Sequence, residues 1–222
     1  MDWPALMLSL ELAAATLAVL LPLGLALGRW LARTAWAGKA WVEALVVLPL
    51  VLPPTVLGYY LLVTLGASSP LGAWLAEHLG VRLTFNFAGL LLASVVFNLP
   101  FMVQPIQRAF EAIPRELREA AAVHGLGAWQ TLWRVELPLA WPGILSALVL
   151  TFVHTLGEFG VVLMVGGNIP GETRTIAIAI YDRVQAFDLA SADRMALLLT
   201  LLSLLAVAAS FGATARLRRR EG

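Results

Sequence analysis

His154 and Glu158 are the side chains best suited to acid–base or metal chemistry, and they stand in the otherwise uncharged stretch LTFVHTLGEFG. Four positions apart on a helix, they would share one face and could pair. Two ligands fall short of a zinc site, which takes three or four from the protein. With Asn98 they could form the polar centre of an enzyme. Catalysis needs a nucleophile with a base, or a metal with enough ligands, and these residues supply neither.

Composition and missing motifs narrow the chemistry further. The chain has no cysteine, which excludes thiol catalysis, disulfides and thiolate metal sites. It has no G-x-x-x-x-G-K-[ST] motif, so we expect no nucleotide to bind this chain. A net charge of +1 gives no bulk attraction to nucleic acid. With 60% hydrophobic and 13% charged residues and a mean hydropathy of +0.84, the chain belongs in a membrane.

The elements that position these residues must therefore be membrane spans. Uncharged runs cover 12–28, 44–76, 83–107, 137–157 and 195–215, and a crossing helix needs roughly 20 apolar residues. GASSPLG at 66–72 is typical of a turn, so the second run should cross once. We predict an all-α polytopic membrane protein, a single domain over 1–222, with five transmembrane helices at about 8–29, 44–65, 84–107, 140–165 and 194–216. The first lacks the features of a cleaved signal and should be retained. We expect no regulatory domain after the last, which is followed by RLRRREG.

The distribution of basic residues predicts the orientation. Eleven of the 15 lysines and arginines lie between spans 1 and 2, between spans 3 and 4, or after span 5. The positive-inside rule makes that side cytoplasmic. The N-terminus should then be outside, the C-terminus cytoplasmic, and the loop at 108–139 between spans 3 and 4 cytoplasmic.

This loop carries the polar sequence EAAAVHGLGAWQTLWRVELPLAWPG, which begins at Glu119. Pro114 suits the first position of a helix, Gly125 suits a C-cap, and Pro138 should end a second segment. We predict two short amphipathic helices joined at a glycine corner. Their apolar stripes hold Leu117, Ala120, Ala121 and His124 in the first and Trp129, Leu132 and Trp133 in the second. Periodicity leaves two interpretations open, a helix pair on lipid headgroups or a docking surface for a protein.

Residue spacing in the loop resembles a known family. The pattern E-A-A, three residues, G, nine residues, an aliphatic residue, any residue, L-P is matched by Glu119, Ala120, Ala121, Gly125, Val135, Leu137 and Pro138. It resembles the EAA loop of permease subunits in bacterial ATP-binding-cassette (ABC) importers. The resemblance implies a type I ABC importer permease fold in which the loop is the coupling helix, seated in a cleft of a cytoplasmic ATPase. Glu119 would make polar contact with that ATPase, and Gly125 would allow the sharp turn. Valine at 135, where isoleucine is commoner, keeps the aliphatic branch.

Three further stretches resemble molybdate permeases within that family. They are LPLVLPPTVLGY at 48–59, LGEFG at 156–160 and GNIPGETRTIAIAIYDR at 167–183. We expect molybdate as the transported ion, and tungstate has nearly the same size and charge. Sulfate, thiosulfate or another oxyanion is the alternative. Arg174 and Arg183, on the outer side, could dock a binding protein or attract an anion, although a solvated charge is the commoner role of such arginines.

The pathway or gate should involve Pro53, Pro54, Thr55, Glu158 and Gly160. Prolines in a span free carbonyl groups that are tolerated only against protein or water, although they could equally do no more than kink the helix. An intramembrane carboxylate is a functional candidate, but Glu158 would repel a dianion and is a poor direct ligand. We expect it to hydrogen-bond across helices or to shape the gate, and Asn98 to hydrogen-bond between helices.

The resemblance also implies partners and a mechanism. The chain would form a homodimer in the bacterial inner membrane with two ATPase subunits, which bind ATP and Mg, and with an extracytoplasmic molybdate-binding protein. It would bind no cofactor or metal itself, and transport would proceed by alternating access. A secondary transporter is a further alternative, but such proteins often have inverted repeats and more ionisable groups at the midplane. We find no repeat and only one such carboxylate.

Overall fold

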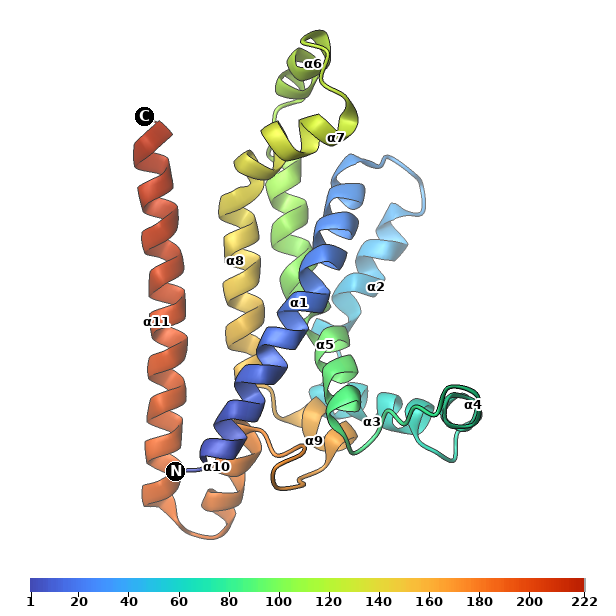
Figure 1. Ribbon diagram of the computed structural model, residues 1–222, viewed down its shortest axis with the longest axis vertical. Helices are drawn as coiled ribbons and strands as arrows, with labels where there is room; N and C mark the ends of the chain where they lie inside the picture. The colour runs from blue at the N-terminus through green and yellow to red at the C-terminus, as the bar shows by residue number, and fades with distance from the viewer. Residues whose placement is uncertain (222) are drawn as a thin grey trace.

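The computed structural model describes residues 1–221, with side chains described for residues 1–212. The chain is built from helices joined by short connections and forms an elongated bundle (Figure 1). Its elements are α1 (Trp3–Arg33), α2 (Lys39–Val51), α3 (Pro54–Leu65), α4 (Pro70–Leu79), α5 (Phe87–Glu111), α6 (Arg115–Val123), α7 (Ala128–Thr131), the π-helical turn η1 (Leu132–Glu136), α8 (Leu137–Leu156), α9 (Gly160–Gly166), α10 (Ile176–Gln185) and α11 (Leu189–Glu221).

Four continuous helical segments in the described residues are long and apolar enough to cross a membrane. They are Trp3–Arg33, Phe87–Glu111, Ala128–Leu156 and Leu189–Gly212. α2 and α3 together pass the same test as a fifth, broken segment. The predicted all-α polytopic class is therefore confirmed, with four or five candidate spans. The predicted end of the last span, at 216, and the arginines that follow lie outside the described side chains.

The second predicted span is two helices and not one. α2 ends at Val51, α3 begins at Pro54, and the two are bent by 108°. Leu52 and Pro53 both precede a proline and are extended, with ψ near 139° and 135°, because a following proline disfavours the helical region. Pro54 can still occupy the first position of α3, where its missing N–H is no loss.

Two details of the fourth predicted span also need correction. Its helix ends at Leu156, so Glu158 lies in the link before α9 and not within a continuous helix over 140–165. Pro138 does not end a helix, because α7 continues through η1 into α8. In η1 the Leu137 N–H bonds to Leu132 O, five residues back. This wider turn gives space for the proline ring, which would crowd the carbonyl four residues back in a regular α-helix.

α1 crosses the bundle in close contact with α5. A Cβ at Gly28 would lie 3.1 Å from Gln107 N and 3.2 Å from Val103 O, so only glycine permits this approach of the two backbones. Small residues at helix contacts allow such packing within membranes. A buried apolar cluster joins α1, α5 and α8, and it is formed by Leu20, Met102, Ile106, Phe110, Ile113, Ala140, Ile144 and Ala147.

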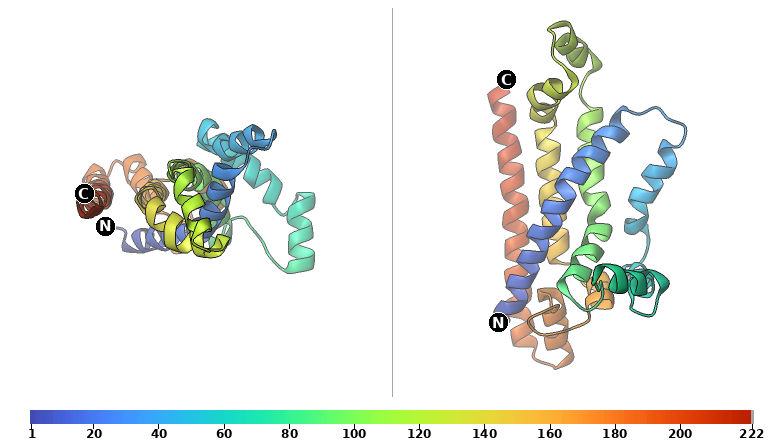
Figure 2. Two further views of the ribbon diagram at one scale, coloured as in Figure 1. Left: turned by 90° about the horizontal axis from the view of Figure 1, so that it is seen from above. Right: turned by 45° about the vertical axis from the view of Figure 1, so that its right-hand side comes forward.

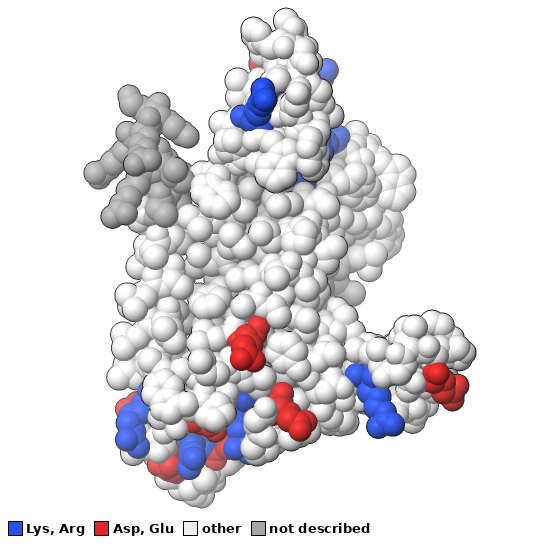
Figure 3. Space-filling view, viewed as in Figure 1, with Lys and Arg blue, Asp and Glu red and all other residues white. Residues whose placement is uncertain are grey.

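The two ends of the bundle differ. α6, α7, the α1–α2 link and the C-terminal part of α11 lie at one end, and the N-terminus, α4, α9 and α10 lie at the other (Figure 1, Figure 2). α4 is a short helix in a stretch for which the sequence predicted only a turn. On the face in Figure 3, charged side chains gather mainly at the two ends. The predicted cytoplasmic arginines of the described residues lie at the α6 end, and the inside–outside orientation stays a prediction.

Candidate functional site

A cavity of about 590 Å³ lies where the break between α2 and α3 meets the link between α8 and α9. It is lined by Pro54, Thr55, Phe97, Val153, His154, Gly157, Glu158, Phe159 and Gly160. Four of the five residues predicted for the pathway or gate are among them, although they come from stretches about 100 positions apart. The fifth, Pro53, is the N-cap of α3 and is exposed beside its first turn. We call this space the gate cavity.

Two glycine contacts hold α3 against α9 at the gate cavity. A Cβ at Gly160 would lie 3.0 Å from Pro54 Cβ, and one at Gly58 would lie 2.7 Å from Met164 Cβ. Each contact is closer than side chains normally allow, so the two helices approach through their glycines. The first residues of both helices therefore face the same space.

Buried polar groups of α5 contact Glu158, and a group of α1 reaches it through α5. Thr16 Oγ1 donates to Ser94 Oγ at 3.1 Å, and Ser94 Oγ donates to Glu158 Oε2 at 3.1 Å. Asn98 Nδ2 donates to Glu158 Oε2 at 3.2 Å and to Ser94 O at 2.9 Å. Thr16, Ser94 and Asn98 are fully buried and Glu158 is 4% exposed. Buried polar groups that are paired in this way hold their elements in one arrangement. We call these residues, with His154, the Glu158 network.

His154 joins this network through Asn98 and not through Glu158. Its Nδ1 lies 2.9 Å from Asn98 Oδ1. An amide oxygen can only accept, so Nδ1 carries the hydrogen and Nε2 is an acceptor in the neutral ring. The ring stacks on Phe101, with 4.0 Å between centroids. Asn98 hydrogen-bonds between helices, as predicted, whereas His154 and Glu158 do not pair directly.

The Glu158 carboxylate is satisfied on one oxygen only. Oε2 accepts from Ser94 and Asn98, whereas Oε1 is buried and has no hydrogen-bond partner among the described side chains. Sequence reasoning missed Ser94 and Thr16. Ser94 is four positions before Asn98 on α5, a spacing that could have indicated a shared face. No pattern in the sequence indicates Thr16, because α1 meets α5 only in the folded chain.

The predicted glycine corner of the coupling loop is present. Gly125 has φ +78°, and Leu126 N–H bonds to Ala121 O at 3.0 Å. This is a Schellman motif, which ends a helix with a left-handed residue, usually glycine. Nothing lies within 4 Å of a Cβ placed at Gly125, so the backbone conformation alone requires glycine there.

α6 exposes most of the surface that a docking partner would touch. Its apolar side chains Leu117 and Val123 are 43% and 87% exposed, and Ala120 is exposed as well. Ala121 is buried against the chain itself. Glu119 is exposed and pairs with Arg115 at 2.6 Å, and exposed pairs of this kind contribute little to stability. Val135, Leu137 and Pro138 lie at the junction of η1 and α8, where the loop joins the bundle.

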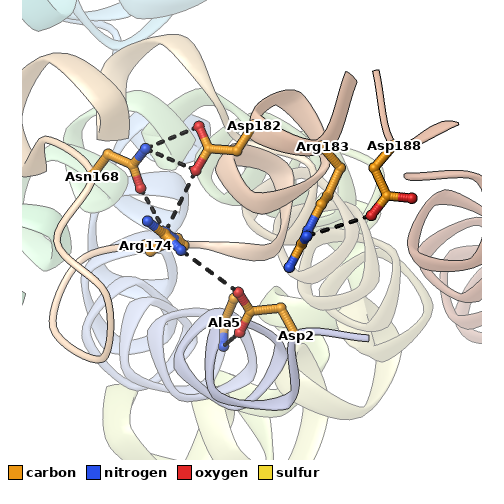
Figure 4. Close-up of polar contacts among 7 residues, drawn as sticks. All are labelled: Asp2, Ala5, Asn168, Arg174, Asp182, Arg183 and Asp188. Carbon is orange, nitrogen blue, oxygen red and sulfur yellow. Dashed lines mark hydrogen bonds and ion pairs between the residues drawn. The ribbon is translucent and has the colours of Figure 1, made fainter. Parts of the chain in front are cut away.

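The two arginines predicted to lie on the outer side, Arg174 and Arg183, are paired with acids. Arg174 Nε lies 2.7 Å from Asn168 Oδ1 and 3.5 Å from Asp182, and its Nη1 lies 3.9 Å from Asp2 (Figure 4). Arg183 lies 3.4 Å from Asp188, and hydrogen bonds from Ser191 lower the pKa of Asp188. The contacts tie α1, α10 and the link before α10 together, so these arginines have structural partners in addition to solvent.

Comparison with known proteins agrees with the loop and the fold. The family model described as binding-protein-dependent transport system inner membrane component matches residues 21–221. The molybdenum transport system permease protein ModB of Azotobacter vinelandii is 52% identical, over 88% of this chain and 86% of that protein. Its namesake from Escherichia coli K12 is 40% identical, over 83% and 80%. A bacterial ABC transporter involved in alginate import has the same fold, with a TM-score of 0.79 at 19% identity over 96% of this chain and 78% of that one.

The loop motif and the fold thus indicate the same family as the family model that matches residues 21–221. The resemblance to permease subunits of bacterial ABC importers is confirmed, and the ATPase and the binding protein are partners of this family. This chain belongs to the family of binding-protein-dependent transport system inner membrane components, the multi-pass permease subunits of bacterial inner-membrane ABC importers.

Proposed function

We propose that this chain forms, as a homodimer, the pathway through which molybdate enters the cell, and that tungstate can share it. The substrate rests on the high identity to proteins named molybdenum transport permeases. The pathway rests on one structural observation, which is that the predicted gate residues gather at a break in an apolar segment.

That break argues for a second copy. Pro53, Pro54 and Thr55 are exposed although they lie within a run of 33 residues without a charge, 44–76. Backbone groups freed by a break in a helix are tolerated at membrane depth only against protein or water, never against lipid. A partner subunit and a water-filled pathway together would cover this face, with the two gate cavities on either side of the pathway.

The gate residues have separate roles in this proposal. Thr55 supplies a hydroxyl in the first turn of α3, where Pro54 has no N–H and the Val56 N–H already bonds to Pro53 O at 2.9 Å. A neutral hydroxyl donor suits the passage of a dianion. Glu158 does not bind the ion, because its charge would repel it. The Glu158 network instead fixes the link at 157–159, and with it the wall opposite Thr55.

The coupling loop provides the energy input. Two ATPase subunits, which bind ATP and Mg, would each receive one α6 through the exposed Leu117, Ala120 and Val123, with Glu119 as the polar contact. A molybdate-loaded binding protein would dock at the opposite end, near α4 and α10. ATP binding then turns the pathway outward, and hydrolysis resets it. This chain binds no nucleotide itself.

The test is ATP hydrolysis by the permease reconstituted with its ATPase and binding protein, with molybdate, tungstate and sulfate compared as loads. Stimulation by molybdate and tungstate but not by sulfate is the expected result. Equal or greater stimulation by sulfate would make the chain a sulfate permease. The mass of the purified permease in detergent tests the dimer, and a monomer within the active complex would contradict it.

A further inference from the structure

Glu136 is a fully buried carboxylate held by two arginines of another helix. Its Oε2 lies 2.8 Å from Arg29 Nε, and its Oε1 is ion-paired with the guanidinium of Arg33. The Glu136 side chain is 1% exposed, and those of Arg29 and Arg33 are 26% and 31% exposed. The two arginines stand in the last turns of α1, four positions apart. We call the three residues the Glu136 triad.

The position of Glu136 in the loop makes the triad informative. Glu136 is the last residue of η1 and lies between Val135 and Leu137. The loop motif ends in an aliphatic residue, any residue, and L-P, and Glu136 occupies the position at which any residue is accepted. Neither the motif nor the resemblance therefore assigns it a role. π-helical turns within α-helices occur often at functional sites. Through the triad, the end of α1 is fixed to the point where the coupling loop meets the bundle.

α1 makes two more buried polar contacts farther along its length. Near its middle, Thr16 donates to Ser94 and so reaches Glu158 at the gate cavity. Near its start, Ser9 Oγ accepts from Ile176 N at 2.8 Å, at the first turn of α10. One helix thus contacts the coupling loop, the Glu158 network and the outer end of the bundle through directional bonds.

We propose that α1 passes movement of the coupling loop to the gate cavity, with Arg29, Arg33 and Glu136 as positioning residues that fix α1 to the loop. This rests on the proposed function, in which the loop is moved by the ATPase. α1 is one helical segment from Trp3 to Arg33, so a displacement of its end at the ion pairs with Glu136 would be carried to the Thr16–Ser94 hydrogen bond near its middle. The path through α1 is additional to the direct continuity of η1 with α8.

Stability alone does not account for the triad. Burying charges is expensive, and buried ion pairs can often be replaced by apolar residues of similar size without loss of stability. Directional bonds, in contrast, hold the loop in a single register against α1. This difference supplies the test, because apolar replacement of all three residues should keep the fold and remove the directional link.

The first experiment measures uptake per ATP hydrolysed in proteoliposomes that contain the full complex. Glu136→Gln and the triple variant Arg29→Leu, Arg33→Leu, Glu136→Met should both assemble with the ATPase. Both should lose about fivefold or more in uptake per ATP, the lower range of allosteric coupling. The control is Arg108→Gln, which removes an exposed ion pair with Glu111, 2.9 Å long, at the same end, and it should behave as wild type.

The second experiment tests whether the triad and the middle of α1 act together. Thr16→Val should lower uptake per ATP, and the double variant Thr16→Val, Glu136→Gln should be no worse than the stronger single variant, because both interrupt one link. Thr151→Val is the matched control, since the Thr151 hydroxyl is also buried but has no hydrogen-bond partner among the described residues.

The outcomes distinguish failure of the proposed path through α1, which we call the link, from failure of the proposed function. Wild-type uptake per ATP in both triad variants would overturn the link, as would independent, multiplying losses in the double variant. Recovery of uptake in the triple variant alone would show a purely structural triad and would also overturn it. Absence of stimulated hydrolysis in the unmodified complex would instead overturn the proposed function and the link with it.

Discussion

Asn98 donates a hydrogen bond to Glu158 across 60 positions of sequence, with 3.2 Å between Nδ2 and Oε2. The same amide accepts from His154, so one side chain orients both ionisable groups beside the gate cavity. Asn98 therefore shares with Ser94 the hydrogen bonding of Glu158 Oε2, and it alone sets the tautomer of His154. A residue chosen from the sequence only for its polarity at membrane depth is the centre of the network.

Asn98→Leu should destabilise the protein and reduce transport. It leaves the half-buried His154 donor unpaired and removes one of two donors to the buried Glu158, and an unsatisfied buried group costs about 1–3 kcal/mol. Thermal unfolding in detergent, followed by the loss of monodisperse protein, measures the change. Asn168→Leu breaks a comparable set of bonds at an exposed site, where water can replace them, so it should cost less. Equal stability of both variants would contradict the network.

Thr55→Cys should react with a small, membrane-impermeant thiol reagent in assembled complexes. The chain has no native cysteine, so labelling of this subunit carries no background. Thr55 lines the gate cavity and is exposed beside the α2–α3 break, where water is expected. Leu205 on α11 is 66% exposed, so a Leu205→Cys side chain should face lipid and stay unlabelled. Protection of the Thr55 cysteine in every nucleotide state would remove Thr55 from the pathway.

Gly125→Val should weaken coupling, whereas Gly127→Ala should not. Gly125 has a positive φ, which costs a residue with a side chain about 1–2 kcal/mol. Gly127 has φ −67° and, like Gly125, has nothing within 4 Å of an added Cβ. The two glycines thus differ in backbone conformation and not in available space. Stimulated ATP hydrolysis and uptake are the measurements, and equal activity of the two variants would refute the requirement for a left-handed corner.

Glu119→Arg should abolish productive docking of the ATPase while the permease remains folded. Glu119 is exposed, and its pair with Arg115 contributes about 0–1 kcal/mol at most. A fall in stimulated hydrolysis at unchanged thermal stability is the expected result. Glu116→Arg, on the same exposed helix, is the matched control and should retain more activity. If uptake by the Glu119 variant equalled that of wild type, its contact with the ATPase would be disproved.

Local sequence determined the class of this protein and the coupling corner. Charge-free runs of about 20 residues require burial in lipid, so the all-α polytopic class followed from composition. Gly125 was predictable because helix ends obey local backbone rules. The fixed spacing of residues from Glu119 to Pro138 identified the family, and the model of that family matches residues 21–221.

The sharp bend at Leu52–Pro53 and the passage of the helix through Pro138 had opposite outcomes for the same residue type. At Leu52 and Pro53, each followed by a proline, the helical conformation is disfavoured and the helix breaks. At Pro138 the π-helical turn η1 makes room for the ring and the helix continues. The sequence marked these prolines, but a proline in a span permits either a kink or a break, so the outcome at each was not predictable from the residue type alone.

Tertiary structure alone decided the partners of the polar residues. His154 and Glu158 looked like a pair by spacing, yet Asn98 stands between them because α8 ends at Leu156. No sequence pattern singled out Glu136 or Thr16. Both became buried contacts of α1 because that helix crosses α5 and α8, and contacts between helices far apart in sequence leave no periodic signal within either helix.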